Sequence, residues 1–118
     1  YYQALAELAA EGYFTLPQVP EYCRHNAHIF YLRLSENVDR TDFICHMKQS
    51  GVSTPFHYIP LHSSPAGEQF GFFHEQDQYT TRESEKLVRL PLFHDLSIDL
   101  QQQVIKAVKA FFYRKSPL

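Results

Sequence analysis

The sequence predicts a small α+β domain, with a mixed or antiparallel sheet of about three strands and helices packed on it. Three observations indicate this class. Apolar residues recur at helical spacing, short runs of β-forming residues alternate with these stretches, and Pro and Gly separate them. At 118 residues the chain suffices for one compact domain with its own core. We therefore expect a single domain over 1–118.

The N-terminal part, 1–25, is expected to be a lead-in helix and a connector. Leu5 and Leu8 lie at helical spacing, and Gly12 follows as a helix stop. Two prolines after it predict an extended connector. Because the helical pattern is already under way at Tyr1, and because this residue is not Met, we expect more chain before it.

Two strands and one helix are predicted next. Residues 28–34 are rich in β-forming side chains and predict a strand. Asp39 is a good N-cap for a helix that Gly51 ends. Residues 52–59 predict a second strand. Pro55 lacks the amide hydrogen that a ladder needs, so this strand should lie at an edge or carry a bulge.

The second half begins with a long loop. Residues 62–79 predict an irregular segment, and such long loops are often functional. Thr80 and Glu83 have the spacing of a capping box and predict a short helix. Residues 87–90 predict a third strand. Ser97 is a good N-cap for the last helix, whose apolar stripe comprises Leu100, Val104, Val108, Phe111 and Phe112.

Composition excludes several classes of function. The net charge of −2 argues against nucleic acid as a partner, since phosphate binding usually needs a basic excess. No apolar run approaches the roughly 20 residues that span a bilayer, so we expect no membrane partner. Cys23 and Cys45 lack a C-x-x-C spacing; we interpret them as free thiols in the cytoplasm, with one disulfide as the alternative.

Aromatic residues are unusually placed. The chain has eight Tyr and ten Phe but no Trp. Several lie in the long loop rather than in a periodic element, and they are Phe70, Phe72, Phe73 and Tyr79. We expect these side chains and Phe56 to be exposed in the isolated chain. Such a surface is typical of a contact with a partner or with another part of the protein.

The strongest local group of polar residues is His57-Tyr-Ile-Pro-Leu-His62, which leads from a predicted strand into the loop. Two histidines and a tyrosine offer hydrogen bonds and a cation suited to a phosphate or a sugar hydroxyl. The alternative is that His57 and Tyr58 are half-buried strand residues whose partners are backbone groups. The residue types alone favour this structural alternative.

Other chemistries have weaker support. A metal site would need several cysteines and histidines to converge without matched zinc spacing, so we expect no metal; the candidates are Cys23, His25, His28, Cys45, His57 and His62. Ser63 and Ser64 lie outside any G-x-S-x-G turn. No lysine is an evident Schiff-base residue, and no glycine-rich phosphate loop is present. The residues indicate a binding surface and no catalytic residue.

Several segments together resemble the C-terminal part of the DegT/DnrJ/EryC1/StrS aminotransferases. They are residues 26–34, 51–52, 57–62, 90–93 and 104–105. The motif HYxPLH at 57–62 is fairly specific to that family. Residues 65–71 and 79–87 look like one subfamily in particular, the dTDP-4-amino-4,6-dideoxygalactose transaminases of enterobacterial common antigen synthesis.

The resemblance implies the C-terminal small domain of a longer fold-type I enzyme. That enzyme would be a homodimer whose large domain holds pyridoxal phosphate. It would transfer an amino group from glutamate to the 4-keto carbon of a dTDP-4-keto-6-deoxyhexose. By resemblance His57 and Tyr58 line the nucleotide-sugar pocket, with His62 and His28 as weaker candidates. The piece alone is expected to bind no cofactor and to be inactive.

A second hypothesis does not need the missing domain. A free-standing, non-catalytic α+β module could bind a metabolite or a protein through its aromatic loop. An open reading frame that continues upstream with a lysine-bearing domain supports the enzyme. A start codon just before Tyr1 supports the module.

Overall fold

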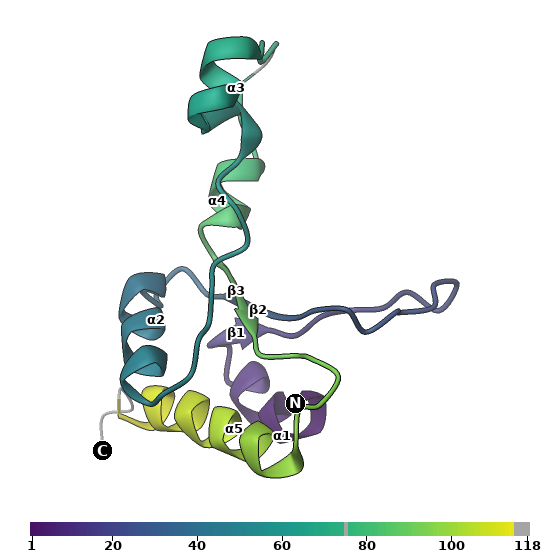
Figure 1. Ribbon diagram of the computed structural model, residues 1–118, viewed down its shortest axis with the longest axis vertical. Coiled ribbons are helices and arrows are strands. Elements are labelled where there is room, and N and C mark those ends of the chain that lie inside the picture. The colour runs from purple at the N-terminus through teal and green to yellow at the C-terminus, as the bar shows by residue number, and fades with distance from the viewer. Residues whose placement is uncertain (75, 115–118) are drawn as a thin grey trace.

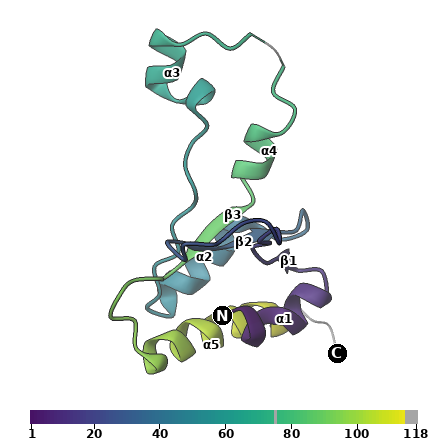
Figure 2. The same cartoon turned by 90° about the vertical axis from the view of Figure 1, so that its right-hand side faces the viewer.

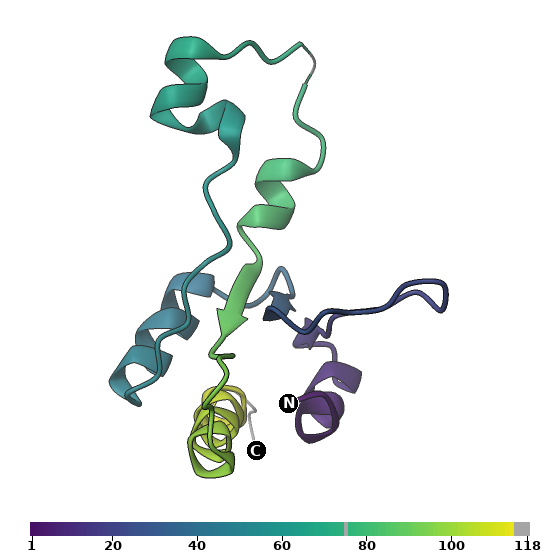
Figure 3. The same ribbon diagram turned by 45° about the vertical axis from the view of Figure 1, so that its right-hand side comes forward.

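A computed structural model describes residues 1–74 and 76–114 as an α+β fold, which confirms the predicted class. The range 1–118 predicted for the domain also includes residue 75 and residues 115–118, which lie outside the described part. Three antiparallel strands lie in the order β1-β2-β3, with bounds Phe14–Thr15, Phe30–Leu34 and Leu87–Leu90. Three helices lie together on one side of these strands (Figure 3), and they are α1 (Tyr2–Ala10), α2 (Arg40–Gln49) and α5 (Ile98–Tyr113).

The core forms between this sheet and these helices. Alternate residues of β2 and β3 are buried, with Leu32 paired to Val88 across the two strands. Helix α5 brings Val108 and Phe112 against them, both almost fully buried. The predicted stripe is confirmed apart from Leu100, which is exposed because the first turn of α5 extends past the core. Burial of this apolar surface is the main source of the fold's stability.

The predicted helix boundaries are confirmed where a cap signal was present. The Asp39 carboxylate accepts a hydrogen bond from the Asp42 amide at the start of α2, and the Ser97 hydroxyl accepts one from the Leu100 amide at the start of α5. Gly51 follows α2 with a φ of +75°, a backbone conformation that favours glycine. These local signals fix where the two helices begin and end.

The second strand predicted over 52–59 is wrong. The structure has only one isolated bridge here, between Phe56 and Val88. Pro55 has no amide hydrogen to donate, and Tyr58 adopts a φ of +65°, outside the β region. The segment therefore runs beside β3 without forming a ladder.

The third strand of the sheet comes instead from the predicted connector. In β1, Phe14 pairs with Leu34 and Thr15 pairs with Arg33. A strand of two residues is too short to show an alternating pattern, so no sequence pattern predicted it.

Residues 57–86, here called the arm, leave the sheet as a long excursion that returns as β3 (Figure 1). The predicted irregular loop contains a short 3₁₀ helix, η1 (Leu61–Ser63), and α3 (Pro65–Phe70). The signal for α3 was a serine followed by proline, because Ser64 caps the helix and Pro65 occupies its first turn. None of the described residues of the arm is buried.

The predicted capping box at α4 (Thr80–Ser84) is also wrong. Asp77 caps this helix: its carboxylate accepts hydrogen bonds from the Thr80 and Thr81 amides, at 2.8 and 2.9 Å. Glu83 does not turn back to the helix start because Arg33 of β2 binds its carboxylate. This bond lowers the pKa of Glu83 to about 2. A tertiary ion pair thus replaces the local motif.

Candidate functional site

The HYxPLH motif begins at the base of the arm. His57 is half-buried, and its Nδ1 atom is shielded from water without a hydrogen-bond partner in the described residues. Tyr58 follows in the left-handed region with its side chain 64% exposed. The two rings touch, with centroids 4.6 Å apart. A bulky residue in this backbone region costs free energy, and such positions concentrate at functional sites.

Arg89 of β3 completes this cluster, although none of the sequence motifs includes this residue. Its guanidinium carbon lies 5.3 Å from the centroid of the Tyr58 ring. Its Nε atom is buried without a hydrogen-bond partner in the described residues. The Arg89 amide donates to the Pro55 carbonyl at 2.9 Å, which holds the strand beside the motif. We call His57, Tyr58 and Arg89 the Tyr58 cluster.

The guanidinium of the Tyr58 cluster has no carboxylate partner in the described residues, unlike two other cations. Arg33 binds Glu83, and Lys86 binds Glu36 at 2.8 Å. Within residues 1–74 and 76–114, by contrast, Arg89 makes no ion pair. A half-buried guanidinium without a carboxylate is unusual, because burying an unpaired charge is costly. The arrangement suits an anion from outside this segment.

Strand alternation gave the only sequence signal for Arg89. Val88 and Leu90 face the helices, so Arg89 faces the opposite side of the sheet, across from its partner Tyr31 on β2. What the sequence does not show is that Tyr58 reaches this face, since that contact depends on the turn at the base of the arm.

His62, predicted as a weaker substrate-binding residue, lies away from this cluster. Its Nε2 atom is 3.2 Å from the Asp77 carboxylate and 3.3 Å from the Thr81 hydroxyl. Its ring packs on Phe73 at 4.6 Å between centroids. These contacts, here called the His62 clasp, join the outgoing and returning halves of the arm. The geometry gives His62 a structural environment, and its substrate role stays a prediction.

His28, the other weaker candidate, lies on the loop before β2. It is exposed, and its ring nitrogen is bonded to the Asn26 side chain. His28 and Arg89 both line a groove of about 360 Å³ at the end of the sheet. The structure therefore places His28 near Arg89 and not in the Tyr58 cluster itself. Its binding role is likewise untested by the geometry.

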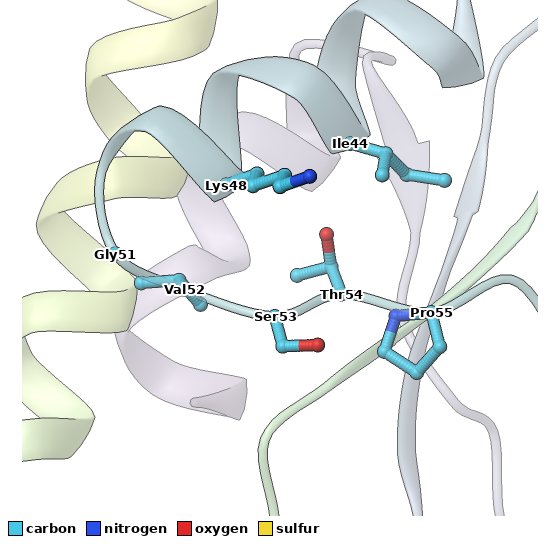
Figure 4. Close-up of a pocket in the computed structure, with 7 residues that line it drawn as sticks. All are labelled: Ile44, Lys48, Gly51, Val52, Ser53, Thr54 and Pro55. Atoms are coloured by element: carbon cyan, nitrogen blue, oxygen red, sulfur yellow. The ribbon is translucent and has the colours of Figure 1, made fainter.

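A second hollow lies between α2 and the segment that follows it (Figure 4). It measures about 470 Å³, and the Thr54 hydroxyl points toward it, almost fully buried and without a partner in the described residues. Lys48 brings one exposed ammonium group over the same hollow. The remaining lining is mostly apolar or backbone. It has no aromatic ring or second cation, so it suits a nucleotide sugar less well than the Tyr58 cluster.

The aromatic residues of the arm are exposed, which confirms the expectation for them. Phe70 and Phe72 are 81% and 90% exposed, and the other side chains are 42% exposed or more, namely Phe56, Phe73 and Tyr79. Exposed rings gathered on an extended arm are typical of a surface that another part of a protein covers.

Several findings bear on the classes considered from the sequence. Both cysteines are free and exposed. In the described ranges, no three His, Cys, Asp or Glu side chains gather as metal ligands would. None of the helices there is long and apolar enough to cross a membrane.

The lysines bear on whether the chain could hold a Schiff-base cofactor. Such a lysine needs a desolvated pocket that favours its neutral form. The side chain of Lys86 is 12% exposed, and its ammonium group forms ion pairs with Glu36 and Glu83. Lys48 and Lys106 are exposed, Lys109 is half-buried, and Lys115 lies outside the described residues. None of the four described lysines is buried, as a lysine in a desolvated Schiff-base pocket would be.

Sequence comparison places these features in a family. Residues 1–109 match the DegT/DnrJ/EryC1/StrS aminotransferase family. The chain belongs to this family. One relative is the spore coat polysaccharide biosynthesis protein SpsC of Bacillus subtilis, 30% identical over 98 residues. The match covers 79% of this chain but only 25% of SpsC.

Two solved structures share the fold of this chain. The aminotransferase TlmJ from Streptoalloteichus hindustanus superposes with a TM-score of 0.76 at 23% identity, over 95% of this chain and 30% of TlmJ. NtdA from Bacillus subtilis, solved with bound cofactor PMP, gives 0.76 at 24% identity, over 96% of this chain and 26% of NtdA. The chain thus corresponds to less than a third of each of these proteins, as expected for one domain of a larger enzyme.

Proposed function

We propose that this chain is the C-terminal small domain of a pyridoxal-phosphate-dependent aminotransferase that acts on a nucleotide sugar. The reaction transfers an amino group from glutamate to the 4-keto carbon of a dTDP-4-keto-6-deoxyhexose. It serves cell-surface polysaccharide synthesis of the enterobacterial common antigen type, in the cytoplasm. The observation that carries this proposal is the family match together with the HYxPLH motif at an unsatisfied, strained site.

The Tyr58 cluster supports a substrate-facing role for His57 and Tyr58. Buried polar atoms nearly always have a hydrogen-bond partner. Here Nδ1 of His57 and Nε of Arg89 lack one in the described residues, while Tyr58 touches both side chains. A cluster whose polar groups are incomplete in the isolated domain fits a place where substrate binds. His62, which lies on the arm, and His28, which lines the groove beside Arg89, are proposed as secondary contacts to the substrate.

The rest of the enzyme would supply the cofactor and most of the chemistry. The comparison proteins are more than three times as long as the matched segment, and NtdA carries PMP. We therefore assign cofactor binding to a large domain of the same polypeptide, and homodimer formation to the complete enzyme. The exposed arm would pack against that larger body. In this arrangement the small domain orients the sugar nucleotide and closes the site over it.

The test is an amination assay with the intact protein. Glutamate and dTDP-4-keto-6-deoxyglucose are expected to yield the 4-amino sugar nucleotide, detected by mass spectrometry. His57→Ala and Tyr58→Phe should lower kcat/KM by about 10-fold or more, because each loses a contact with a charged or polar substrate. Equal activity with keto sugars that carry no nucleotide would contradict the proposal.

A matched control tests whether the loss of activity is specific to the motif or follows from removing any histidine. His94 is fully exposed at its side chain and lies outside the Tyr58 cluster. His94→Ala should leave kcat/KM unchanged. Loss of activity in His94→Ala equal to that in His57→Ala would show that the effect is not specific to the motif.

A further inference from the structure

We infer that Arg89 is a phosphate-binding residue of this protein and takes the diphosphate group of the nucleotide sugar while Tyr58 holds its guanidinium in place. This inference rests on the proposed function, because it names which part of the substrate meets the Tyr58 cluster. It also adds a residue that neither the motif nor the family match singles out.

The first step is the charge of Arg89. Arginine remains protonated at every physiological pH, so its charge needs an anion or water. Among the half-buried cations of the described ranges, Arg33 binds Glu83, Lys86 binds Glu36, and Arg40 donates a hydrogen bond to the Ser84 carbonyl. Arg89 has no such partner there, and none of its side-chain nitrogens makes a hydrogen bond. Its terminal nitrogens are left to a ligand.

The second step is orientation. The Tyr58 ring lies over the guanidinium at 5.3 Å, and Nε is buried. The left-handed backbone at Tyr58 directs that ring to this face of the sheet. The stem of Arg89 is held by β3, whose amide at the same residue bonds Pro55. A guanidinium fixed on one side presents its remaining donors as a fork, which matches paired phosphate oxygens.

The third step distinguishes the two anions of the reaction. Both a diphosphate and the carboxylates of glutamate suit an arginine fork. The groove that Arg89 lines is about 360 Å³, and Phe93 and His28 border it, while the Tyr58 ring contacts the guanidinium outside the groove lining. Aromatic rings and a histidine beside the cation fit a bulky nucleotide better than a small amino acid. We therefore assign the diphosphate to Arg89.

The experiment measures binding to the intact protein by calorimetry, without turnover. dTDP, UDP, GDP and unphosphorylated thymidine are compared. Arg89→Gln should weaken binding of dTDP by about 10- to 100-fold, the effect of losing a hydrogen bond to a charged group. Arg89→Lys, which keeps the charge but not the fork, should fall between wild type and Arg89→Gln. Thymidine binding should not change.

Arg82→Gln is the matched control. Arg82 also lies over a tyrosine ring, that of Tyr79 at 5.9 Å, but it has a carboxylate partner in Glu83 at 3.2 Å. This variant should bind dTDP as wild type does. Far-ultraviolet circular dichroism of each variant shows whether it has folded, and Arg89→Lys provides the comparison if Arg89→Gln has not.

The outcomes separate this inference from the proposed function. If UDP or GDP binds and loses affinity in Arg89→Gln while no dTDP-sugar is aminated, the diphosphate site stands and the proposed substrate is wrong. If the Arg89 variants bind dTDP normally, or if only the KM for glutamate rises, the inference is wrong although the aminotransferase assignment survives. Absence of any nucleoside diphosphate binding to the wild-type protein overturns it as well.

Discussion

The helices beneath the sheet and the arm differ in what holds them together. Sixteen apolar residues of the part that the structure describes are buried in the core, including Phe112 and Leu8. The arm projects from the sheet (Figure 2), and its described residues include none that is buried. Its two halves are joined by polar contacts such as the His62 clasp. Apolar burial thus specifies the core, whereas a few hydrogen bonds and ring contacts specify the arm.

This difference separates stability from recognition. Polar contacts such as Arg33–Glu83 and Arg40–Ser84 join the arm to the core elements, but none of the described arm residues is buried, so we expect the core to keep its fold when the exposed end of the arm is changed. The Tyr58 cluster lies at the junction, where a rigid strand supplies Arg89 and the arm supplies His57 and Tyr58. A site built on a strand can be precise while its other half moves with the arm.

The largest expected difference in stability is between replacing a phenylalanine of the core and replacing one of the arm. Phe112 is 1% exposed and packs against Phe14, with ring centroids 5.3 Å apart. Phe112→Ala should lower the free energy of unfolding by about 3–5 kcal/mol, from lost burial and the cavity left behind. Phe72 is 90% exposed, so Phe72→Ala should change it by less than about 0.5 kcal/mol. Urea denaturation of the 118-residue chain measures both.

A substantial loss of stability in Phe72→Ala would break the comparison, because it would show that the arm packs on the core in solution. In the intact protein the expectation reverses for the arm. There Phe72→Ala should lower stability if a larger domain covers this surface.

A smaller effect is expected from the helix caps. Ser97 caps α5 in the core, and Ser64 caps α3 in the arm, each through a hydroxyl that accepts from the backbone amide three residues ahead. Ser97→Ala should lower the free energy of unfolding by about 1 kcal/mol. Ser64→Ala should leave it unchanged, although α3 loses the same hydrogen bond. Equal losses would indicate that arm and core unfold together.

The pH dependence of the arm is the most local prediction. Hydrogen bonds from Thr81 and Thr80 lower the pKa of Asp77 to about 2, from a usual 3.8. A depressed pKa means that this carboxylate stabilises the arm above pH 3.8 and that the contribution is lost as the pH falls through about 2. The amide NMR shifts of Thr80 and Thr81 should therefore titrate near pH 2.

Asp77→Asn should remove that titration and leave the amide shifts of β2 and β3 as in wild type. A midpoint near the usual value in the wild-type chain would mean that the carboxylate does not cap α4 in solution.

The sequence was sufficient where signals were local. The caps of α2 and α5 and the apolar stripe of α5 predicted those helices, and β-forming residues predicted β2 and β3. The α+β class followed from these elements, whereas the count of three strands agreed only because the missed β1 replaced the wrongly predicted strand over 52–59. The side chains that determine each of these elements lie close together in the sequence. Tertiary contacts therefore did not override the local preference.

The sequence was insufficient where a distant residue decided the outcome. Arg33 draws Glu83 away from the predicted capping box, and Asp77 takes over the cap. Residues 52–59 read as a strand because composition does not reveal the left-handed turn at Tyr58. The motif identified His57 and Tyr58. Arg89 emerged only once the fold brought β3 beside them.

Strands β2 and β3 pair with each other although the arm separates them in the sequence. This arrangement has a practical consequence. A protease that cut the exposed tip between α3 and α4 would leave one piece carrying α1, β1, β2 and α2 and another carrying β3 and α5. Both pieces would contribute to the same apolar core, so they should stay associated without a covalent link. The domain is thus suited to being expressed as two complementing halves, and its arm to accepting an inserted tag.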